Sequence, residues 1–156
     1  MEIVKTVELR APRARVWRAV SDAREFGAWF GMGFDGPFVP GEAITGRLTP
    51  TQVDAEVAKM QAPHAGMQFE FLVVAIEPER RLELKWHPFA IDPEVDYSRE
   101  AMTRIEFLLE DVEHGTRLTI TESGFEHLPE ARRSKALEAN RGGWDHQARL
   151  IAKYLA

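Results

Sequence analysis

The sequence predicts an α+β fold in which a curved antiparallel sheet wraps around one long C-terminal helix. Three observations predict it: several segments alternate apolar and polar side chains, two short helical segments follow the first of them, and an amphipathic helical segment, 129–155, ends the chain. One face of an antiparallel sheet must be covered, and only the final segment is long enough to cover it.

The N-terminal elements are a strand and two short helices. Residues 2–10 alternate as a half-buried strand does, with Lys5 as a polar intrusion on the apolar side. Pro12 suits the first turn of a helix, and an apolar stripe over 16–20 follows it. Asp22, with Glu25 three residues later, predicts the cap of a second helix that ends near residue 29.

The segment 24–41 (REFGAWFGMGFDGPFVPG) combines five aromatic residues with five glycines. Aromatic side chains are core material, whereas glycines break regular structure and permit tight turns. We expect this loop to fold its aromatics inward over the end of the groove between sheet and helix, as a lid. Exposed instead, they would form a patch suited to a protein partner or a homodimer.

Alternation predicts the remaining strands, and two pairs of them read as hairpins with turns at 77–80 and 114–115. These strands are 43–48, 67–76, the segment that carries Leu82, Leu84 and Trp86 on one face, 103–111 and 116–124. Two segments fit no element: 49–66 holds either a helical turn around 55–60 or an extended excursion, and 88–101 is a long loop. Long loops in compact domains commonly cover or bind something.

Composition predicts a single domain over 1–156 in the cytoplasm. The chain is 44% hydrophobic and 29% charged, has no cysteine, and begins without the pattern of a signal peptide. No apolar run approaches the roughly 18 residues that span a bilayer. The net charge of -5 and scattered basic residues argue against nucleic acid as a partner, and the pair Arg132-Arg133 is expected on a solvated helix face.

Motifs for metal, nucleotide or serine chemistry are missing from the sequence. The five histidines are far apart and lack the spacing of a helical metal site. No GxSxG elbow surrounds a serine, and the glycines of GMGFDG match neither GxGxxG nor a P-loop. We therefore expect no metal and no cofactor.

Several stretches resemble a known family. They are VWRAVSDAREFGAWFG (16–31), GPFVPGEAITG (36–46), DYSREAMTRIEFLLE (96–110), GTRLTITESGFEHLP (115–129) and GGWDHQARLIAKYL (142–155). They resemble bacterial stand-alone proteins of the heat-shock-protein ATPase-activator-like group, in the START and birch-pollen-allergen-like (SRPBCC) superfamily. The resemblance implies a helix-grip fold with a deep cavity that binds hydrophobic ligands in many relatives. Those relatives include lipid carriers, hormone receptors, polyketide cyclases and a co-chaperone domain.

The residues expected to line such a cavity come from the sheet, the last helix and the segment 24–41. We predict as ligand-binding residues Trp29, Phe30, Phe34, Phe38, Phe69, Phe71, Trp86, Phe107, Ile120, Glu122, Asn140, Gly143, Trp144 and Gln147. The competing interpretation is that these aromatics simply fill the core. Gly142 and Gly143 bear on the choice, because each costs a helix about 1 kcal/mol relative to alanine. Either close packing on the sheet or room for a guest beside Trp144 would compensate.

Glu122 is the most informative polar position. Counting by twos from Leu118 and Ile120 places its carboxylate on the inward face, where an unpaired charge is costly. We expect a partner on the last helix, among Asn140, Arg141, His146 and Gln147. The carboxylate is then either a buried hydrogen-bonding group or a ligand anchor and candidate general acid/base.

The leading functional prediction is binding of a small hydrophobic molecule, such as a lipid, an aromatic or a polyketide-like compound, between sheet and helix. An alternative is a cyclase or hydratase that moves protons through Glu122. A further alternative, implied by the resemblance alone, is a chaperone-binding module.

Overall fold

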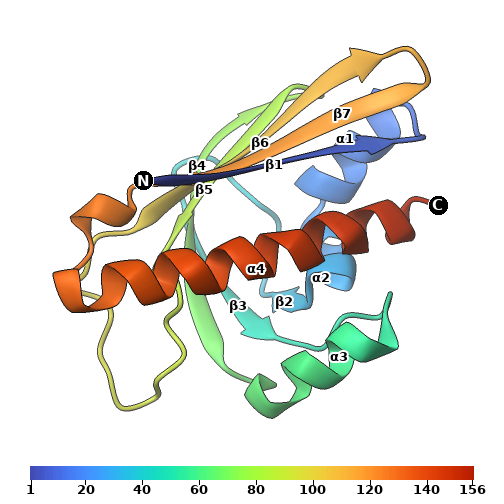
Figure 1. Cartoon of the computed structure of the whole chain (residues 1–156). Helices are drawn as coiled ribbons and strands as arrows, with labels where there is room; N and C mark the ends of the chain where they lie inside the picture. Colours follow the sequence, from blue (N-terminus) through green and yellow to red (C-terminus); the bar gives the residue numbers. More distant parts are fainter.

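The computed structural model describes residues 1–156 as one seven-stranded antiparallel sheet and a long helix on its concave face (Figure 1). The strands lie in the order β1-β7-β6-β5-β4-β3-β2. Their bounds are β1 Glu2–Leu9, β2 Met32–Phe34, β3 Ala43–Leu48, β4 Gln68–Glu77, β5 Arg81–Trp86, β6 Thr103–Val112 and β7 Gly115–Ser123. The predicted α+β, helix-grip architecture is confirmed.

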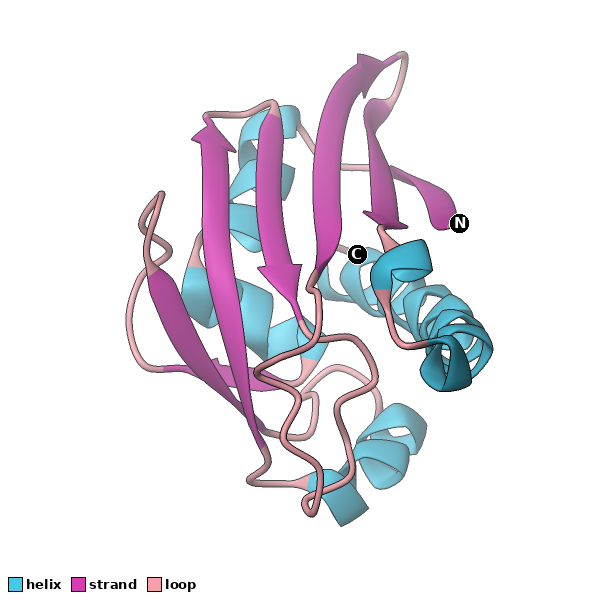
Figure 2. Ribbon diagram, turned by 90° about the vertical axis from the view of Figure 1, so that its left-hand side faces the viewer, coloured by secondary structure: helices cyan, strands magenta, loops and turns pink.

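Four α-helices complete the fold, and α1 and α2 lie behind the strands in the view of Figure 2. They are α1 Arg13–Ser21, α2 Ala23–Phe30, α3 Ala55–Gln61 and α4 Glu130–Tyr154. Two 3-10 turns, Ala62–His64 and Phe125–His127, follow α3 and β7. None of the helices is both long and apolar enough to cross a membrane.

Helix ends follow their predicted signals. The Asp22 carboxylate accepts from the backbone N–H groups of Arg24 and Glu25, at 2.9 and 3.2 Å, so Asp22 caps α2 as expected. Gly31 ends α2 with a φ of 98°, a conformation that glycine adopts without strain. Asp54 caps α3 in the same manner, which decides the structure of 49–66 in favour of a helix.

The aromatics of the segment 24–41 point inward. Phe26, Trp29, Phe30 and Phe38 are all buried, and Phe26 packs edge-on against Phe107 of β6 with a centroid distance of 5.6 Å. This segment is only partly a loop, because it comprises most of α2 and the short strand β2, which we did not predict. Its side chains therefore close the core and form no exposed aromatic patch.

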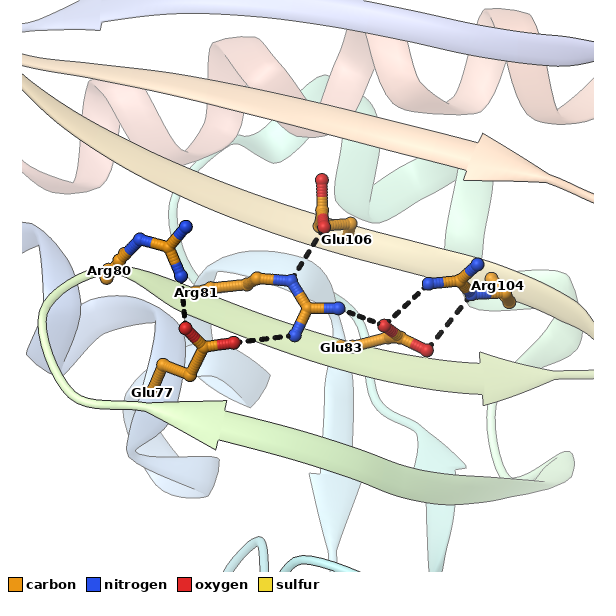
Figure 3. A network of polar contacts seen from close by, with 6 residues as sticks. All are labelled: Glu77, Arg80, Arg81, Glu83, Arg104 and Glu106. Atoms are coloured by element: carbon orange, nitrogen blue, oxygen red, sulfur yellow. Dashed lines mark hydrogen bonds and ion pairs between the residues drawn. The ribbon is translucent and has the colours of Figure 1, made fainter.

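Charged residues cover the convex face of the sheet, where Glu83 lies between two arginines (Figure 3). Arg81 also pairs with Glu77 at 2.9 Å and with Glu106 at 2.7 Å, and Arg104 donates to both oxygens of Glu83. Glu83 is only 4% exposed, and the hydrogen bond from Arg104 holds its pKa below the ordinary value. The apolar side chains lie on the opposite, concave face.

Lys5 is explained by the same inward geometry. Its ammonium group reaches from the concave side of β1 to Asp145 on α4, with 2.7 Å between nitrogen and carboxylate oxygen. The polar intrusion in the first strand therefore ties the sheet to the helix.

Candidate functional site

The Glu122 carboxylate lies in the interior, fully buried, and accepts four hydrogen bonds. From α4, the Asn140 amide donates at 2.9 Å and the Trp144 indole N–H at 2.8 Å, both to Oε1. From the sheet, the Trp86 indole N–H donates at 2.7 Å and the Thr103 hydroxyl at 2.5 Å, both to Oε2. The predicted inward carboxylate within reach of the helix is confirmed.

All four donors are neutral, and no cation lies against Glu122. Arg141 is exposed and His146 contacts Arg149, so neither of these expected candidates is the partner. These four neutral donors supply the hydrogen bonds that water would make to the carboxylate if it were exposed. Because the donors come from both layers, the carboxylate joins the sheet to α4.

Thr103 was missed by sequence reasoning. It lies opposite Trp86 in the pairing of β5 with β6, and its side chain shares the concave face with Ile105 and Phe107. Alternation along β6 places Thr103 on the inward face, whereas the predicted partners of Glu122 all lay on the last helix.

A small pocket lies beside this carboxylate, between α2, β5 and α4. Its volume is about 70 Å³. It is lined by Phe30, Trp86, Asn140, Gly143, Trp144 and Gln147. All six belong to the set predicted from sequence, and we call this space the tryptophan pocket.

Three aromatic rings form the walls of the tryptophan pocket. The ring centroids of Phe30, Trp86 and Trp144 are separated by 5.9 to 6.2 Å in each pair. Because both indole N–H groups are bound to Glu122, the carboxylate fixes the orientation of two of the walls. Glu122 therefore positions the pocket from behind and does not line it.

Gln147 has an unpaired amide oxygen beside the tryptophan pocket. Its amide nitrogen donates to the backbone carbonyl of Phe30 at 3.0 Å, and Gln61 of α3 donates to the same carbonyl at 3.1 Å. The amide oxygen of Gln147 is buried and has no hydrogen-bond partner. Unpaired buried acceptors are uncommon, so this oxygen is an unsatisfied polar atom on a side chain that lines the tryptophan pocket.

The two helix glycines are not explained by close packing. A Cβ atom built on Gly142 or Gly143 would meet nothing within 4 Å, whereas only Gly143 lines the tryptophan pocket. Of the two compensations considered, close packing on the sheet applies to neither glycine. Both glycines are exposed on α4, and room beside Trp144 stays a proposal for Gly143 alone.

The other predicted ligand-binding residues do not line the tryptophan pocket. Trp29, Phe71, Phe107 and Ile120 are buried in the core, and the Trp29 indole donates to the backbone carbonyl of Ala19. Phe34 and Phe38 pack against each other and against Phe26, and both line a separate open pocket of about 690 Å³ beside the start of α2. Phe69 lines a different pocket, under the loop that follows β5. Most of the predicted aromatic set therefore fills the core.

Aromatic side chains fill most of the interior beside Trp144, so the space that remains there is smaller than a deep ligand cavity. Pockets for drug-sized ligands measure roughly 300 to 1,000 Å³, and an engineered cavity of about 150 Å³ holds benzene. The tryptophan pocket, at about 70 Å³, holds only the end of such a molecule. Asn140 and Trp86 are partly exposed, so the rest of a ligand has a path to solvent.

The curved sheet, the gripped helix and the pocket between them define a protein of the helix-grip, START-like class. The sequence profile of the activator of Hsp90 ATPase homolog 1-like proteins matches residues 10–156. The chain therefore belongs to this family.

Solved structures support the same fold. Protein MLL2253 from Mesorhizobium loti is 19% identical, with a TM-score of 0.71, and the alignment covers 99% of this chain and 96% of that one. The Aha1 dimer from Colwellia psychrerythraea is 17% identical, with a TM-score of 0.69 and coverages of 99% and 96%. DynU16, from the dynemicin biosynthetic locus, is 22% identical with a TM-score of 0.68, and this chain spans only 46% of its length. A search of curated proteins found no match.

Proposed function

We propose that the protein binds a small, largely apolar molecule by inserting one end of it into the tryptophan pocket. The observation that carries this proposal is the coincidence of an aromatic wall, a helix glycine that leaves space, and a buried amide oxygen without a partner. Aromatic walls favour an apolar ligand, and the Gln147 oxygen favours a hydroxyl or N–H donor at its inserted end.

Glu122 supports binding in this proposal by positioning Trp86 and Trp144. The cyclase or hydratase alternative would require its carboxylate to exchange a proton with a ligand. Four donors already occupy the carboxylate, and two tryptophans separate it from the pocket. This geometry favours the binding function over the enzymatic one.

The test uses the four indole N–H signals of the protein in a two-dimensional NMR spectrum. Hexanol and indole serve as probes, because each has an apolar body and one donor. We expect either probe to shift the signals of Trp86 and Trp144, and to leave Trp17 and Trp29 unchanged. Equal shifts at all four tryptophans, or no shift up to the solubility limit of both probes, would refute the proposal. Native mass spectrometry of gently purified protein then identifies any natural ligand.

The chaperone-binding alternative has family membership as its support. A pull-down with a purified Hsp90-type chaperone tests it, and absence of binding would remove it. The ligand proposal is independent of this outcome.

A further inference from the structure

A second pocket lies under the long loop 87–102, which joins β5 to β6. Its volume is about 300 Å³, and its opposite wall is the start of β4. Among its lining residues are Phe69, Glu70, His87, Asp92, Val95 and Tyr97. It shares no residue with the tryptophan pocket, and its size reaches the lower end of the range for drug-sized ligands.

The loop that roofs this second pocket is held in place by one side chain of α4. The Arg132 guanidinium donates to the backbone carbonyls of Pro88 and Phe89, at 2.8 and 3.0 Å, and forms an ion pair with the Glu100 carboxylate, with 2.8 Å between nitrogen and oxygen. It also lies over the ring of Tyr97, 4.6 Å from the centroid. The expectation that Arg132 is solvated is wrong, because its side chain is only 18% exposed. A roof fixed in this way loses little freedom when a ligand binds.

Two polar side chains of the second pocket have an unpaired group, the buried Nδ1 of His87 and the exposed carboxylate of Glu70. His87 Nδ1 is buried and makes no hydrogen bond, either as a donor or as an acceptor, so neither tautomer of the ring gives it a partner. The Glu70 carboxylate takes part in no ion pair, and that of Asp92 accepts only from the backbone N–H of Glu94. No lysine or arginine lines the pocket. The side chains that line the second pocket therefore carry net negative charge, and Phe69 gives the pocket an apolar surface.

We propose that this second pocket binds a small organic cation, an amine with an apolar or aromatic body. The ammonium group pairs with the carboxylates of Glu70 and Asp92, and its N–H groups suit a His87 Nδ1 that acts as acceptor. The body of the ligand packs on Phe69 and Val95. This site is separate from the one in the proposed function and does not depend on it.

Three probes with the same carbon skeleton test the charge requirement: phenethylamine, 2-phenylethanol and phenylacetate. Amide chemical shifts of the full chain are followed during each titration. We expect phenethylamine to perturb residues 67–70 and 87–97, with the alcohol at least about fivefold weaker and the carboxylate weaker still. Equal affinity for all three, or no perturbation in these ranges at about 10 mM phenethylamine, would overturn the proposal.

Variants then separate the pocket from general surface charge. Glu70→Gln and Asp92→Asn are each expected to weaken phenethylamine by up to about fivefold, whereas Glu94→Gln, which removes an exposed charge from the same loop outside the pocket, changes it less than about twofold. Gly143→Ala should leave amine binding unchanged, so failure of the proposed function does not affect this test. An unchanged amide spectrum without ligand verifies folding. Equal losses in all three acid variants would contradict the proposal.

Discussion

The indole N–H of Trp144 on α4 meets the carboxylate of Glu122 on β7 at 2.8 Å in the closed interior of the protein. Asn140, one turn earlier in α4, donates to the same oxygen. Trp86 and Thr103 bind the other oxygen from the sheet. One buried carboxylate therefore fixes the position of the helix on the sheet and the orientation of two tryptophans.

Replacing Glu122 with glutamine should strongly destabilise the fold. The amide nitrogen of glutamine is a donor, so it would face two of the four groups that now donate to Glu122. Those two groups would then have no acceptor. We expect the free energy of unfolding, measured in urea, to fall by about 3 kcal/mol. The matched control is Glu110→Gln on the exposed end of β6, with an expected change within about 0.5 kcal/mol.

The cycle of Glu122→Gln and Trp144→Phe measures the coupling between these two residues. We expect an interaction free energy of at least about 1 kcal/mol. Additive effects would show that the contact contributes nothing specific to stability.

The half-buried carboxylate of Glu25 makes stability depend on pH. It accepts from Arg15 and from the Tyr154 hydroxyl, both at 2.8 Å, which joins α1 and α2 to the end of α4. Burial acts to raise the pKa of Glu25, but the hydrogen bonds from Tyr154 and Arg15 outweigh it, and this pKa lies below its ordinary value of 4.5. A carboxyl group whose pKa falls on folding stabilises the protein above its unfolded pKa.

We therefore expect Glu25→Gln to lower the free energy of unfolding by about 1 kcal/mol at neutral pH. The difference from the wild type should shrink as pH falls below the ordinary pKa of 4.5 and through the lower pKa of the folded state. Urea melts at a series of pH values provide the measurement. Glu56→Gln on the exposed face of α3 is the control variant, and a constant difference for Glu25→Gln would contradict the assignment.

The interior pattern of the fold was readable from sequence because alternation and helix caps are local signals. The ends of the predicted strands and of the last helix lie within one residue of the observed ones, and Asp22 caps α2 as predicted. The strand β2 was missed because its three residues, Met32 to Phe34, include a glycine and pair only with β3. Pairing of so short a strand is decided by tertiary contacts, which leave no periodic pattern.

The site was less predictable than the fold. Alternation identified Glu122 as inward, and Asn140 was one of four helix residues named as possible partners, but sequence could not tell which of the four points inward. Sequence could not tell how tightly the aromatics pack, so a deep cavity was expected where a small pocket exists. Likewise, the role of Arg132 depends on a loop that has no regular structure and thus no sequence period.

Arg132 should control the order of the loop 87–102. Its guanidinium makes contacts that a lysine cannot reproduce, because two carbonyls and one carboxylate require a planar fork. We expect Arg132→Lys to speed amide hydrogen exchange in this loop by about tenfold, with little change in the strands. Arg141→Lys, an exposed position on the same helix, is the control. Unchanged exchange in the loop would show that other contacts hold it.

The central claim, that a ligand enters beside Gly143, is tested most directly by comparing two adjacent substitutions. Gly142→Ala and Gly143→Ala should each raise the free energy of unfolding by about 0.5 to 1 kcal/mol, because both remove a helix glycine without meeting a neighbour. Only Gly143 lines the tryptophan pocket. The measurement is the affinity of each variant for hexanol and indole, followed by the Trp86 and Trp144 indole signals. The account predicts that Gly143→Ala abolishes these shifts while Gly142→Ala retains them, and equal binding by both variants would contradict it.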